Sequence, residues 1–277
     1  MNNSRSIRTV KYKELHRILN GISDLLFPPR CPICDDIVFD GNQFKTIRNV
    51  TPGNNTAGNS SSQVISKKYN TLICPACRTK VVRIKEPFCA RCGKALASEA
   101  EYCKDCMNRK HYFIQGMSVF DYGSVSDSLF RFKNKGRREY AKFYAYEILK
   151  ARGMWLKSIN PDALIPVPIH QSKLLSRGYN QAELISKEIS KITKIPTLTD
   201  IVIRCKKTNP LKSLSLTERQ NNIKNAFKVS ENAVKLKTIV IIDDIYTTGT
   251  TIDEISRVIK ARYDCKIYFL TLAIGRG

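Results

Sequence analysis

Several signals that would assign a chain to a familiar class are missing from this sequence of 277 residues. No run of 18 apolar residues occurs, which excludes a conventional membrane-spanning helix. The first ten residues are polar and basic, and residues 11–27 have the pattern of an amphipathic helix rather than the apolar core of a secretory signal. We therefore predict a cytoplasmic protein in which residues 1–30 form an N-terminal helix and a lead-in.

Two common nucleotide-binding motifs are also missing. The sequence contains neither the G-x-x-x-x-G-K spacing of a P-loop nor the G-x-G-x-x-G of a Rossmann fingerprint. Any phosphate site in this chain must therefore be built differently.

Acidic residues are scarce relative to basic ones. The chain has 24 Asp and Glu residues against 47 Lys and Arg residues, and its formal charge is +23. Such an excess favours a polyanionic partner, either nucleic acid or a phosphorylated small molecule. Because the lysines are spread along the whole chain, a generally lysine-rich composition is an equally simple explanation. The charge suggests a class of partner without identifying one.

Cysteines, by contrast, are abundant and patterned. Eight of the ten form four C-x-x-C pairs before residue 107. Each pair can direct two thiolates at one ion, and two pairs complete a closed, tetrahedral zinc site of the structural kind. In a chain without a secretory leader this spacing indicates metal rather than disulfides, with redox pairs or unrelated thiols as the alternatives. The predicted ligands of two structural zinc sites are Cys31, Cys34, Cys74, Cys77, Cys89, Cys92, Cys103 and Cys106.

The sequence alone does not show which C-x-x-C pairs share a zinc ion. The simplest partition is sequential, with the first two pairs on one zinc and the last two on another, but an interleaved cross-brace has the same spacing. We expect a double zinc ribbon over residues 31–107, interrupted by a flexible insertion at about 44–68 that is rich in Asn, Ser, Thr and Gly. Cys205 and Cys265 stand alone in apolar surroundings and are expected to be buried strand residues.

Residues 108–277 alternate predicted helices and strands. Helical spacing marks residues 124–136, 138–159, 180–194 and 250–262. Apolar strand-like runs mark residues 162–169, 201–205, 237–243 and 266–274. The run at 237–243 is too apolar to alternate, as in a sheet covered on both faces. The polar residues 206–227 are predicted to form a loop, and the whole order predicts an open parallel α/β sheet.

The segment IVIIDDIYTTGTT, residues 239–251, places two adjacent acids and a hydroxyl-rich turn at the carboxyl end of a strand. Ligands of parallel α/β sheets bind at this end. The turn leads into a helix whose N-terminal N–H groups favour a phosphate, and the acids can accept hydrogen bonds from a vicinal diol. The pattern predicts a sugar phosphate bound by Asp243, Asp244, Thr247, Thr248, Gly249, Thr250 and Thr251.

This segment resembles the phosphoribosyl-pyrophosphate (PRPP) binding motif of type I phosphoribosyltransferases, two acids followed by T-T-G and a hydroxyl residue. With the cysteine pairs, the stretches FRFKNKGRREYA, IPVPIHQSKLLSRGYNQAELIS and ERQNNIKNAF extend a resemblance to the ComF family of competence proteins, which includes the proteins called GntX. The likeness runs from about Leu25 to the C-terminus, apart from the insertion. RGYNQ at 177–181 is its most distinctive second signature, and Leu211 is a departure, since relatives usually carry glutamine there.

The resemblance implies a type I phosphoribosyltransferase fold over residues 108–277. Asp243 and Asp244 would hold the ribose hydroxyls, residues 247–251 the 5′-phosphate, and Mg²⁺ would be held mainly by pyrophosphate and ribose oxygens. The loop after the strand at 162–169 would bind pyrophosphate, and residues 206–227 would form a mobile hood. The residues implied in this loop and hood are His170, Lys173, Arg177, Gly178 and Arg219. Ordinary alternatives are a turn cap for the histidine, solvent for Arg219 and an acidic partner for Arg177.

The implied reaction is the displacement of pyrophosphate from ribose C1 by a nitrogen nucleophile, whose identity the sequence does not indicate. It depends on positioning and charge stabilisation, so no catalytic serine, cysteine or histidine is expected. The resemblance also implies a link to natural competence and DNA uptake, with single-stranded DNA and competence or recombination proteins as partners. Aromatic residues within the basic stretch 137–157 could stack on bases or be buried. A protein that senses PRPP without turnover is a further alternative.

Overall fold

The computed structural model describes residues 28–38, 72–97, 99–206, 216–231 and 235–275. It divides into two compact units, residues 1–78 and residues 79–277. The helix expected before residue 28 and the insertion at 44–68 lie outside the described residues. The second set of C-x-x-C pairs falls in the same unit as the sheet, and the domain boundaries at 31–107 and 108–277 stay predictions. Among the described helices, none has the length and apolarity needed to cross a bilayer.

The described part of unit 1–78 is a turn and a short helix that carry two cysteine pairs. In the turn, the Cys31 N–H donates to Asp36 O at 2.8 Å and the Asp35 N–H donates to Cys31 O at 2.8 Å. The helix α3 (Pro75–Arg78) starts directly after Cys74.

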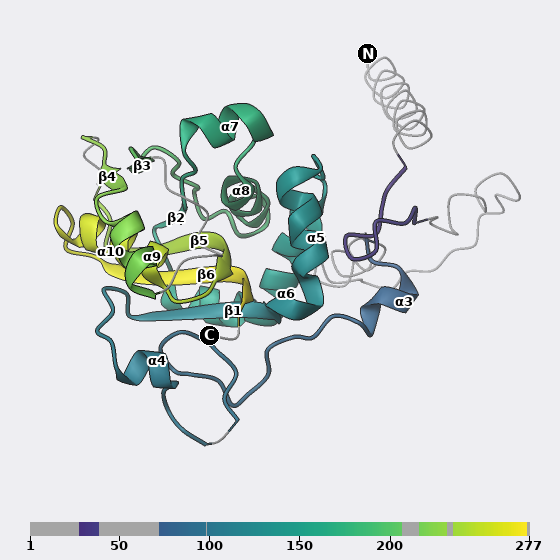
Figure 1. The fold of residues 1–277 in the computed structure, drawn as a ribbon, viewed down its shortest axis with the longest axis horizontal. Helices are drawn as coiled ribbons and strands as arrows, with labels where there is room; N and C mark the ends of the chain where they lie inside the picture. The colour runs from purple at the N-terminus through teal and green to yellow at the C-terminus, as the bar shows by residue number, and fades with distance from the viewer. Residues whose placement is uncertain (1–27, 39–71, 98, 207–215, 232–234, 276–277) are drawn as a thin grey trace, which may run out of the picture. The chain divides into compact units, whose positions relative to one another are not determined.

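Unit 79–277 is built on a four-stranded parallel sheet of order β1-β6-β5-β2, as Figure 1 shows. Its strands are β1 (Gln115–Asp121), β2 (Ala163–Pro166), β5 (Thr238–Tyr246) and β6 (Lys266–Ile274). The central strand β5 pairs with β2 on one side and with β6 on the other. The predicted parallel α/β sheet is therefore confirmed.

The edge strand β1 was not predicted, because its apolar run is short and is broken by Ser118. That hydroxyl is buried, and it forms a hydrogen bond of 2.6 Å with the Thr271 hydroxyl on β6, so the polar group is satisfied inside the sheet. A buried serine such as Ser118 is stable in the core only because the pairing of β1 with β6 brings the Thr271 hydroxyl to it.

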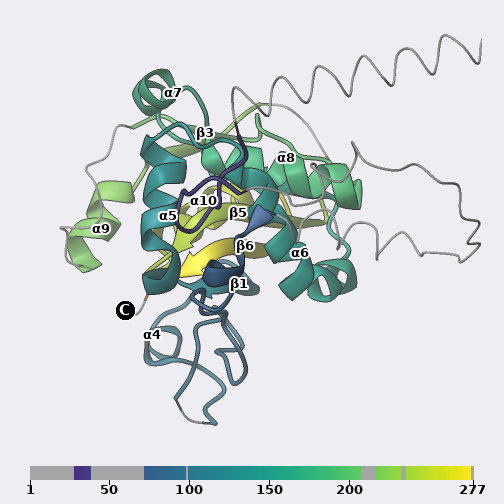
Figure 2. The same ribbon diagram turned by 90° about the vertical axis from the view of Figure 1, so that its right-hand side faces the viewer.

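The helices occupy the positions that their apolar spacing predicts. They are α5 (Tyr122–Asn134), α6 (Tyr140–Ile159), α8 (Gln181–Thr193) and α10 (Thr250–Lys260), with the additional short helix α7 (Gln171–Arg177). Asp121 caps α5 and Asn180 caps α8, since their side chains accept from backbone N–H groups of the first turn. Figure 2 shows these helices from the side at which β1 passes into α5.

Both faces of the sheet are covered. On one face, α8 packs on β2 and β5, α6 packs on β1 and α8, and α5 packs on β1 and β6. On the other, Ile252, Ile255 and Ile259 of α10 share one core with Ile239 and Ile241 of β5. The same core includes Phe113, Phe269, Cys89, Cys92 and Cys103. The near-continuous apolar run of β5 is explained by this double coverage, since successive side chains enter opposite cores.

A second, two-stranded sheet lies outside the main one. The strands β3 (Val202–Arg204) and β4 (Phe227–Val229) pair antiparallel with each other. The strand predicted at 201–205 is therefore confirmed, although it does not join the parallel sheet. The expectation of a loop throughout 206–227 is wrong, because α9 (Leu216–Ile223) forms within it. Residues 207–215, including Leu211, lie outside the described residues.

Four of the five aromatic residues of α6 are in the core, and the fifth, Trp155, is partly buried. Tyr140, Phe143 and Tyr144 are each at most 1% exposed, and Tyr146 is 8% exposed. The interpretation that these rings stack on nucleic-acid bases is therefore wrong, because the period of the helix turns them toward the sheet. Of the two isolated cysteines, Cys265 is buried as expected. The prediction for Cys205 is wrong, because this residue is exposed just after β3.

Candidate functional site

The acid pair lies in the last part of β5. Asp243 and Asp244 are both partly buried, and the Asp244 N–H donates to Asp243 Oδ1 at 2.8 Å. Although adjacent strand residues point to opposite faces, both acids keep partial exposure here, close to the end of the strand. The strand continues to Tyr246, two residues beyond the pair.

Cations from three other elements surround the acids. Lys133 Nζ, at the end of α5, lies 2.8 Å from Asp244 Oδ2. Burial lowers the pKa of Lys173, and the positive charges of Arg204, Arg177 and Lys133 lower it further. Burial also lowers the pKa of Arg204, while the charge of Asp243 opposes that effect. Four cations and two acids therefore share one electrostatic environment at this end of the sheet.

Of these cations, Lys133 and Arg204 were not predicted as site residues. Lys133 lies in the stretch FRFKNKGRREYA, whose likeness to relatives was the only available signal. Arg204 ends an unremarkable three-residue strand, and only the fold brings it near β5.

The acid pair makes stability depend on pH. Burial and the neighbouring carboxylate of Asp244 raise the pKa of Asp243 from 3.8 to about 7. Between about pH 4 and pH 7, Asp243 therefore keeps a proton in the folded state that it has lost in the unfolded state. The free energy of unfolding falls as pH rises through this range.

We expect Asp243→Asn to remove this loss of stability. Denaturant unfolding should show the variant more stable than the parent by on the order of 1–3 kcal/mol above pH 7, with the difference disappearing near pH 4. Asp162→Asn is the control of opposite sign, because hydrogen bonds from the N–H groups of Thr238 and Lys237 lower the pKa of Asp162. Its effect should be a loss of stability at neutral pH that disappears in acid. Parallel pH profiles for Asp243→Asn and the parent would contradict the raised pKa.

The hydroxyl-rich turn joins β5 to α10. Thr247, Thr248 and Thr251 are partly exposed, while Thr250 is 5% exposed and Gly249 is buried. The hydroxyls of Thr248 and Thr250 are 3.1 Å apart. A small hollow of ≈ 10 Å³, about the space of one water molecule, is lined by Asp243, Ile245, Tyr246, Thr247, Gly249, Thr250, Thr251 and Ile252. Asp243 and the turn thus border one small hollow, and Asp244 follows Asp243 on the strand.

Glycine at position 249 is required by geometry. It caps α10 with φ +76°, and a Cβ there would lie 2.5 Å from the Tyr246 hydroxyl oxygen. Tyr246 cannot withdraw easily, because its ring is 4% exposed and stacks on Phe269 with a centroid distance of 4.8 Å.

We expect Gly249→Ala to destabilise the protein by about 2–3 kcal/mol, from the left-handed backbone and the contact with Tyr246 together. Gly153→Ala is the matched control, since Gly153 lies within α6 and an added Cβ would meet nothing within 4 Å. That control should gain roughly 0.5–1 kcal/mol from helix propensity. Equal denaturation midpoints for the Gly249→Ala protein and its parent would contradict the strained turn.

The predicted pyrophosphate loop forms α7 and the turn that follows. His170 Nδ1 accepts from the Ser172 N–H at 3.2 Å and so caps α7, which is the ordinary role considered for it. Arg177 donates to Gln181 Oε1 at 2.6 Å rather than to an acid. Gly178 ends α7 at φ +77° and its carbonyl accepts from Arg138 at 3.0 Å. The loop is therefore ordered by hydrogen bonds, and its Lys173 is close enough to Asp244 and to Arg177 to interact with both electrostatically.

The rest of the RGYNQ signature ties this loop to α5. The Tyr179 hydroxyl donates to Phe132 O, and the Asn180 amide donates to Val167 O at 2.9 Å. Gln181 reaches Lys133 O at 3.5 Å. These contacts place Lys133 and the loop after β2 around the same strand ends. Arg219 lies in α9, and its side chain is outside the described part of the structure.

The eight paired cysteines form two clusters of four, in the sequential partition. Cys31, Cys34, Cys74 and Cys77 form one, and Cys89, Cys92, Cys103 and Cys106 form the other; in each, the four sulfur atoms lie within 4.8 Å of one another. Zinc–sulfur bonds of about 2.3 Å in a tetrahedron separate the sulfurs by roughly 3.8 Å. The Cys34–Cys74 and Cys92–Cys103 sulfur distances are 3.9 and 3.7 Å. The donor sets fit structural zinc.

The two clusters repeat one local design. In each, the first C-x-x-C pair sits on a turn closed by a residue in the left-handed region, Asp35 at φ 69° and Gly93 at φ 73°. The second pair starts a one-turn helix, α3 in one cluster and α4 (Lys104–Met107) in the other. Backbone N–H groups also reach the sulfurs, as that of Cys74 does by donating to Cys31 Sγ at 3.5 Å, and such donors stabilise thiolates that hold an ion.

Comparison with known proteins agrees with these features. A family model described as the double zinc ribbon domain matches residues 64–107, which include six of the eight ligands. The chain is 31% identical over 195 residues to Competence protein F of Haemophilus influenzae, an alignment that covers 68% of this chain and 84% of that protein. The chain belongs to the ComF family of competence proteins. Other ComF-related proteins include the DNA utilization protein YhgH of Escherichia coli strain K12, 29% identical over 68% of this chain and 83% of that protein. Competence protein ComFC of Bacillus subtilis strain 168 is 26% identical over 67% of this chain and 76% of its own length.

Two solved structures of adenine phosphoribosyltransferases have a weak likeness to this ComF chain. The enzyme of Leishmania donovani is 12% identical with a TM-score of 0.29, over 56% of this chain and 69% of that one. The enzyme of Leishmania tarentolae is 13% identical with a TM-score of 0.27, over 57% and 76%.

Proposed function

We propose that this ComF protein binds PRPP with Mg²⁺ at the carboxyl end of β5 and transfers the phosphoribosyl group to a nitrogen acceptor. The observation that carries the proposal is the hollow that Asp243 shares with the hydroxyl turn, next to Asp244 and its cationic partner Lys133. Arg177 and Arg204 lie close enough to Lys133 and Lys173 to form one group of positive charge with them. PRPP has matching parts, namely a vicinal diol, a 5′-phosphate and a pyrophosphate.

Each part of such a ligand has a partner in this chain. Asp243 and Asp244 can accept hydrogen bonds from two ribose hydroxyls, and both remain partly exposed. The N-terminal turn of α10 and the hydroxyls of Thr247 and Thr251 can donate to a phosphate. Negative charge on a departing pyrophosphate would be stabilised by Lys173 and Arg177, and the nearby charges of Lys133 and Arg204 would add to this effect.

The Lys133–Asp244 ion pair has a defined place in this proposal. It balances the charge of one of two adjacent carboxylates. In the proposed complex, the ammonium group would lie between the sugar and the pyrophosphate. Mg²⁺ supplies charge neutralisation of the pyrophosphate, and its preference for oxygen ligands matches phosphate and ribose oxygens beside these acids. The chain's own contribution is to position the sugar and to stabilise charge, so no covalent intermediate with the protein is proposed.

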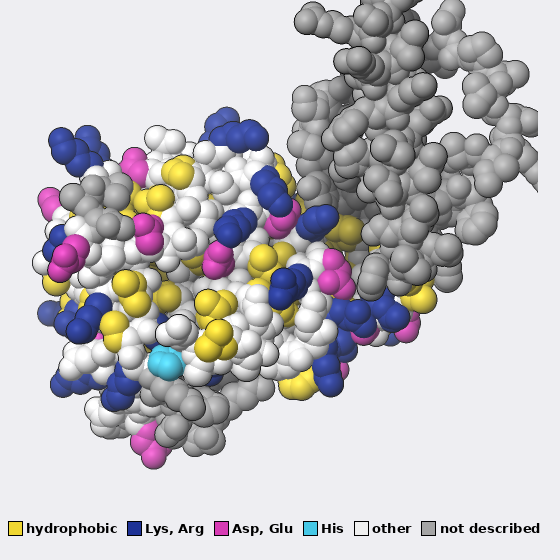
Figure 3. Space-filling view, turned by 90° about the horizontal axis from the view of Figure 1, so that it is seen from above, with side chains coloured by type: hydrophobic (Ala, Val, Ile, Leu, Met, Phe, Trp, Pro, Cys, Tyr) yellow, Lys and Arg dark blue, Asp and Glu magenta, His cyan; other side chains and the backbone are white. Residues whose placement is uncertain are grey.

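We also propose that this activity serves DNA uptake in the cytoplasm. The support is that relatives carry the names competence protein and DNA utilization protein, and that the formal charge of +23 suits a polyanion. Cytoplasmic reducing conditions are those in which eight paired cysteines stay available to metal. Figure 3 shows Lys and Arg side chains spread over the face that carries α7, with acidic side chains between them.

The decisive experiment is calorimetric titration of the protein with PRPP and Mg²⁺, followed by measurement of pyrophosphate release with a panel of amines and bases. Binding with release in the presence of one acceptor class supports a transferase. Binding without release from any acceptor supports a PRPP sensor instead, and a protein that binds no PRPP sinks the proposal.

A further inference from the structure

The helix that follows the hydroxyl turn carries an acidic residue near its N-terminus, which is unfavourable for binding a phosphate there. Asp253 lies in the first turn of α10, directly beyond the hydroxyl turn. A carboxylate there would repel a phosphate dianion bound at the same helix end, since both compete for the same positive end of the helix dipole. If the turn binds phosphate, the negative charge of Asp253 must be offset by hydrogen-bond donors or cations from elsewhere in the chain.

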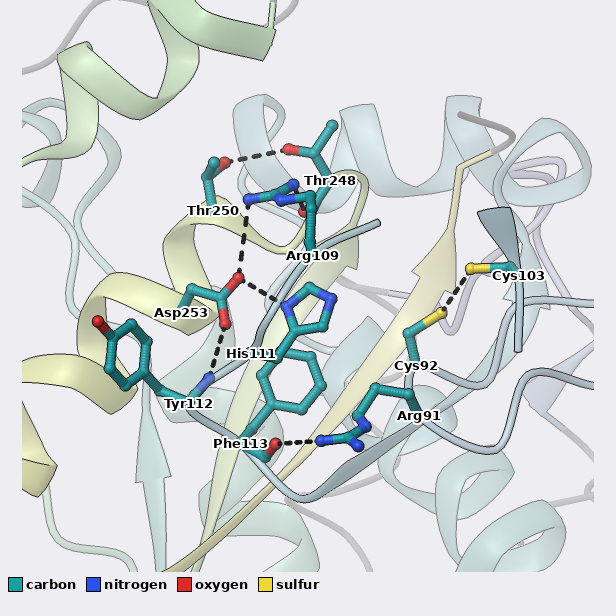
Figure 4. A network of polar contacts seen from close by, with 10 residues as sticks. All are labelled: Arg91, Cys92, Cys103, Arg109, His111, Tyr112, Phe113, Thr248, Thr250 and Asp253. Carbon is teal, nitrogen blue, oxygen red and sulfur yellow. Dashed lines mark hydrogen bonds and ion pairs between the residues drawn. The ribbon is translucent and has the colours of Figure 1, made fainter. Parts of the chain in front are cut away.

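Three donors from a single short segment meet this carboxylate. His111 Nδ1 lies 2.8 Å from Asp253 Oδ2, Arg109 NH2 lies 3.8 Å from the same oxygen, and the Tyr112 N–H donates to Oδ1 at 3.2 Å. Because a carboxylate only accepts, His111 Nδ1 carries the hydrogen. Figure 4 shows the three residues grouped around Asp253. The negative charge of Asp253 is thus stabilised by donors from residues 109–112.

Arg109 also holds the turn itself. Its NH1 donates to the Thr248 carbonyl oxygen at 2.8 Å. In a planar trans peptide the carbonyl and the following N–H point in opposite directions, so drawing Thr248 O toward Arg109 turns the Gly249 N–H the other way. Gly249 lines the hollow beside the acid pair, whereas Thr248 does not. One hydrogen bond therefore orients a donor toward the place where the phosphate is proposed to bind.

The segment is anchored at both ends. Arg109 follows the second cysteine cluster by three residues, after α4, in which the Met107 N–H donates to Cys103 O at 3.0 Å. Beyond it, Phe113 is 1% exposed and packs edge-on against Phe269 with a centroid distance of 4.9 Å. Phe113 and three cysteines of the cluster belong to the core that also holds α10. The side chains of Arg109 and His111, 19% and 2% exposed, are thereby held against the turn.

We propose that Arg109 is a positioning residue for the phosphate turn, and that the second zinc ribbon serves the ligand site by holding Arg109 in place. Arg109 fixes the Thr248–Gly249 peptide and, with His111, offsets the charge of Asp253. This inference rests on the proposed function for its ligand, but the ordering of the turn is independent of any ligand. The ribbon would then be part of the site's construction and not a separate module.

The test compares Arg109→Gln with Arg262→Gln in otherwise intact protein. Arg262 is the matched control, because its NH2 also donates to a backbone carbonyl, Glu231 O at 3.2 Å, at an exposed position away from the turn. Three quantities are measured: zinc content, amide hydrogen exchange of residues 247–251 without ligand, and PRPP affinity by calorimetry. Arg109→Gln should keep the zinc content of the parent, speed exchange in the turn about fivefold or more, and weaken PRPP binding by about 10-fold or more.

The control should match the parent in all three quantities. Should Arg109→Gln not fold, Arg109→Lys replaces it, retaining the charge and one donor, with smaller increases of about threefold expected in exchange and in the PRPP dissociation constant. Unchanged exchange in the turn overturns the positioning role, whatever the affinity. If the parent protein binds no PRPP, the proposed function fails while the exchange comparison still decides the role of Arg109.

Discussion

Replacing Asp243 and Asp244 together with asparagine is expected to weaken PRPP binding at least about 100-fold. Each carboxylate in this site can accept a charge-assisted hydrogen bond from a ribose hydroxyl, and such bonds contribute about 1.5–3 kcal/mol each. Losing two of them amounts to roughly 3–6 kcal/mol, or about 10²–10⁴ in the dissociation constant. Calorimetry in the presence of Mg²⁺ measures the loss directly.

The folded state should not suffer from this double replacement. Asparagine has nearly the same shape, and removing two adjacent carboxylates relieves the repulsion that contributes to the raised pKa of Asp243. Lys133 loses an ionic partner but stays partly exposed to water, so its charge remains solvated. The thermal midpoint is the control, and a fall of more than a few degrees would mean that lost binding reflects unfolding.

Binding of single-stranded DNA by the same double variant separates the two proposed roles. If DNA binds through lysines spread over the surface, the variant should bind it as the parent does, with affinity falling as salt is added. Retained PRPP affinity in the double variant would contradict the assignment of the acid pair. Joint loss of both ligands in a folded variant would instead place DNA and PRPP in one site.

Loss of the second metal site is expected to have a large effect on stability. Elemental analysis should find about two zinc ions per chain, and Cys103→Ser should reduce this to about one. Cys89, Cys92 and Cys103 are part of the core formed by β5, β6 and α10, so losing their ion opens the interior of unit 79–277. We expect the midpoint of that unit to fall by about 10 °C or more, since structural zinc contributes several kcal/mol and 1 kcal/mol shifts a domain of this size by about 2–4 °C.

The first cluster offers a contrast, and an isolated thiol offers a control. Cys34→Ser should also lower zinc to about one per chain, but its cluster belongs to unit 1–78, so the melting of unit 79–277 should stay near that of the parent. Cys205→Ser should keep two zinc ions and the parent's midpoint, because Cys205 is an exposed free thiol. Equal midpoints for Cys103→Ser and Cys205→Ser would show that the second ribbon does not support the core.

Much of this arrangement could be predicted from local patterns. Four C-x-x-C pairs indicate two four-cysteine metal sites, because a tetrahedral ion needs four sulfurs and each pair delivers two from one turn. The apolar run of β5 indicates a doubly covered strand, and the acids and threonines that follow it indicate a ligand site at its carboxyl end. These signals lie within a few residues of one another, where sequence spacing determines geometry.

Other features needed the fold. The strand β1 is stabilised by a buried hydroxyl pair with β6, and the stretch 206–227 contains a helix despite its polarity. The aromatic residues of α6 left both a nucleic-acid surface and a core open, with burial favoured, and packing against the sheet places Tyr140, Phe143 and Tyr144 in the core. Lys133 and Arg204 become site residues only because α5 and β3 end near Asp243 and Asp244.

By itself, the sequence determined the class of this ComF protein: a cysteine-rich metal module, a parallel α/β sheet, and an acid pair followed by a hydroxyl turn. The tertiary structure alone decided that the four thiolates of each site come from consecutive pairs, and that Arg109 meets Thr248 across 139 residues of chain. The physical reason is one of range. Backbone periodicity and turn geometry are set by neighbouring residues, whereas hydrogen bonds and charge pairs between distant segments exist only after the core has brought those segments together.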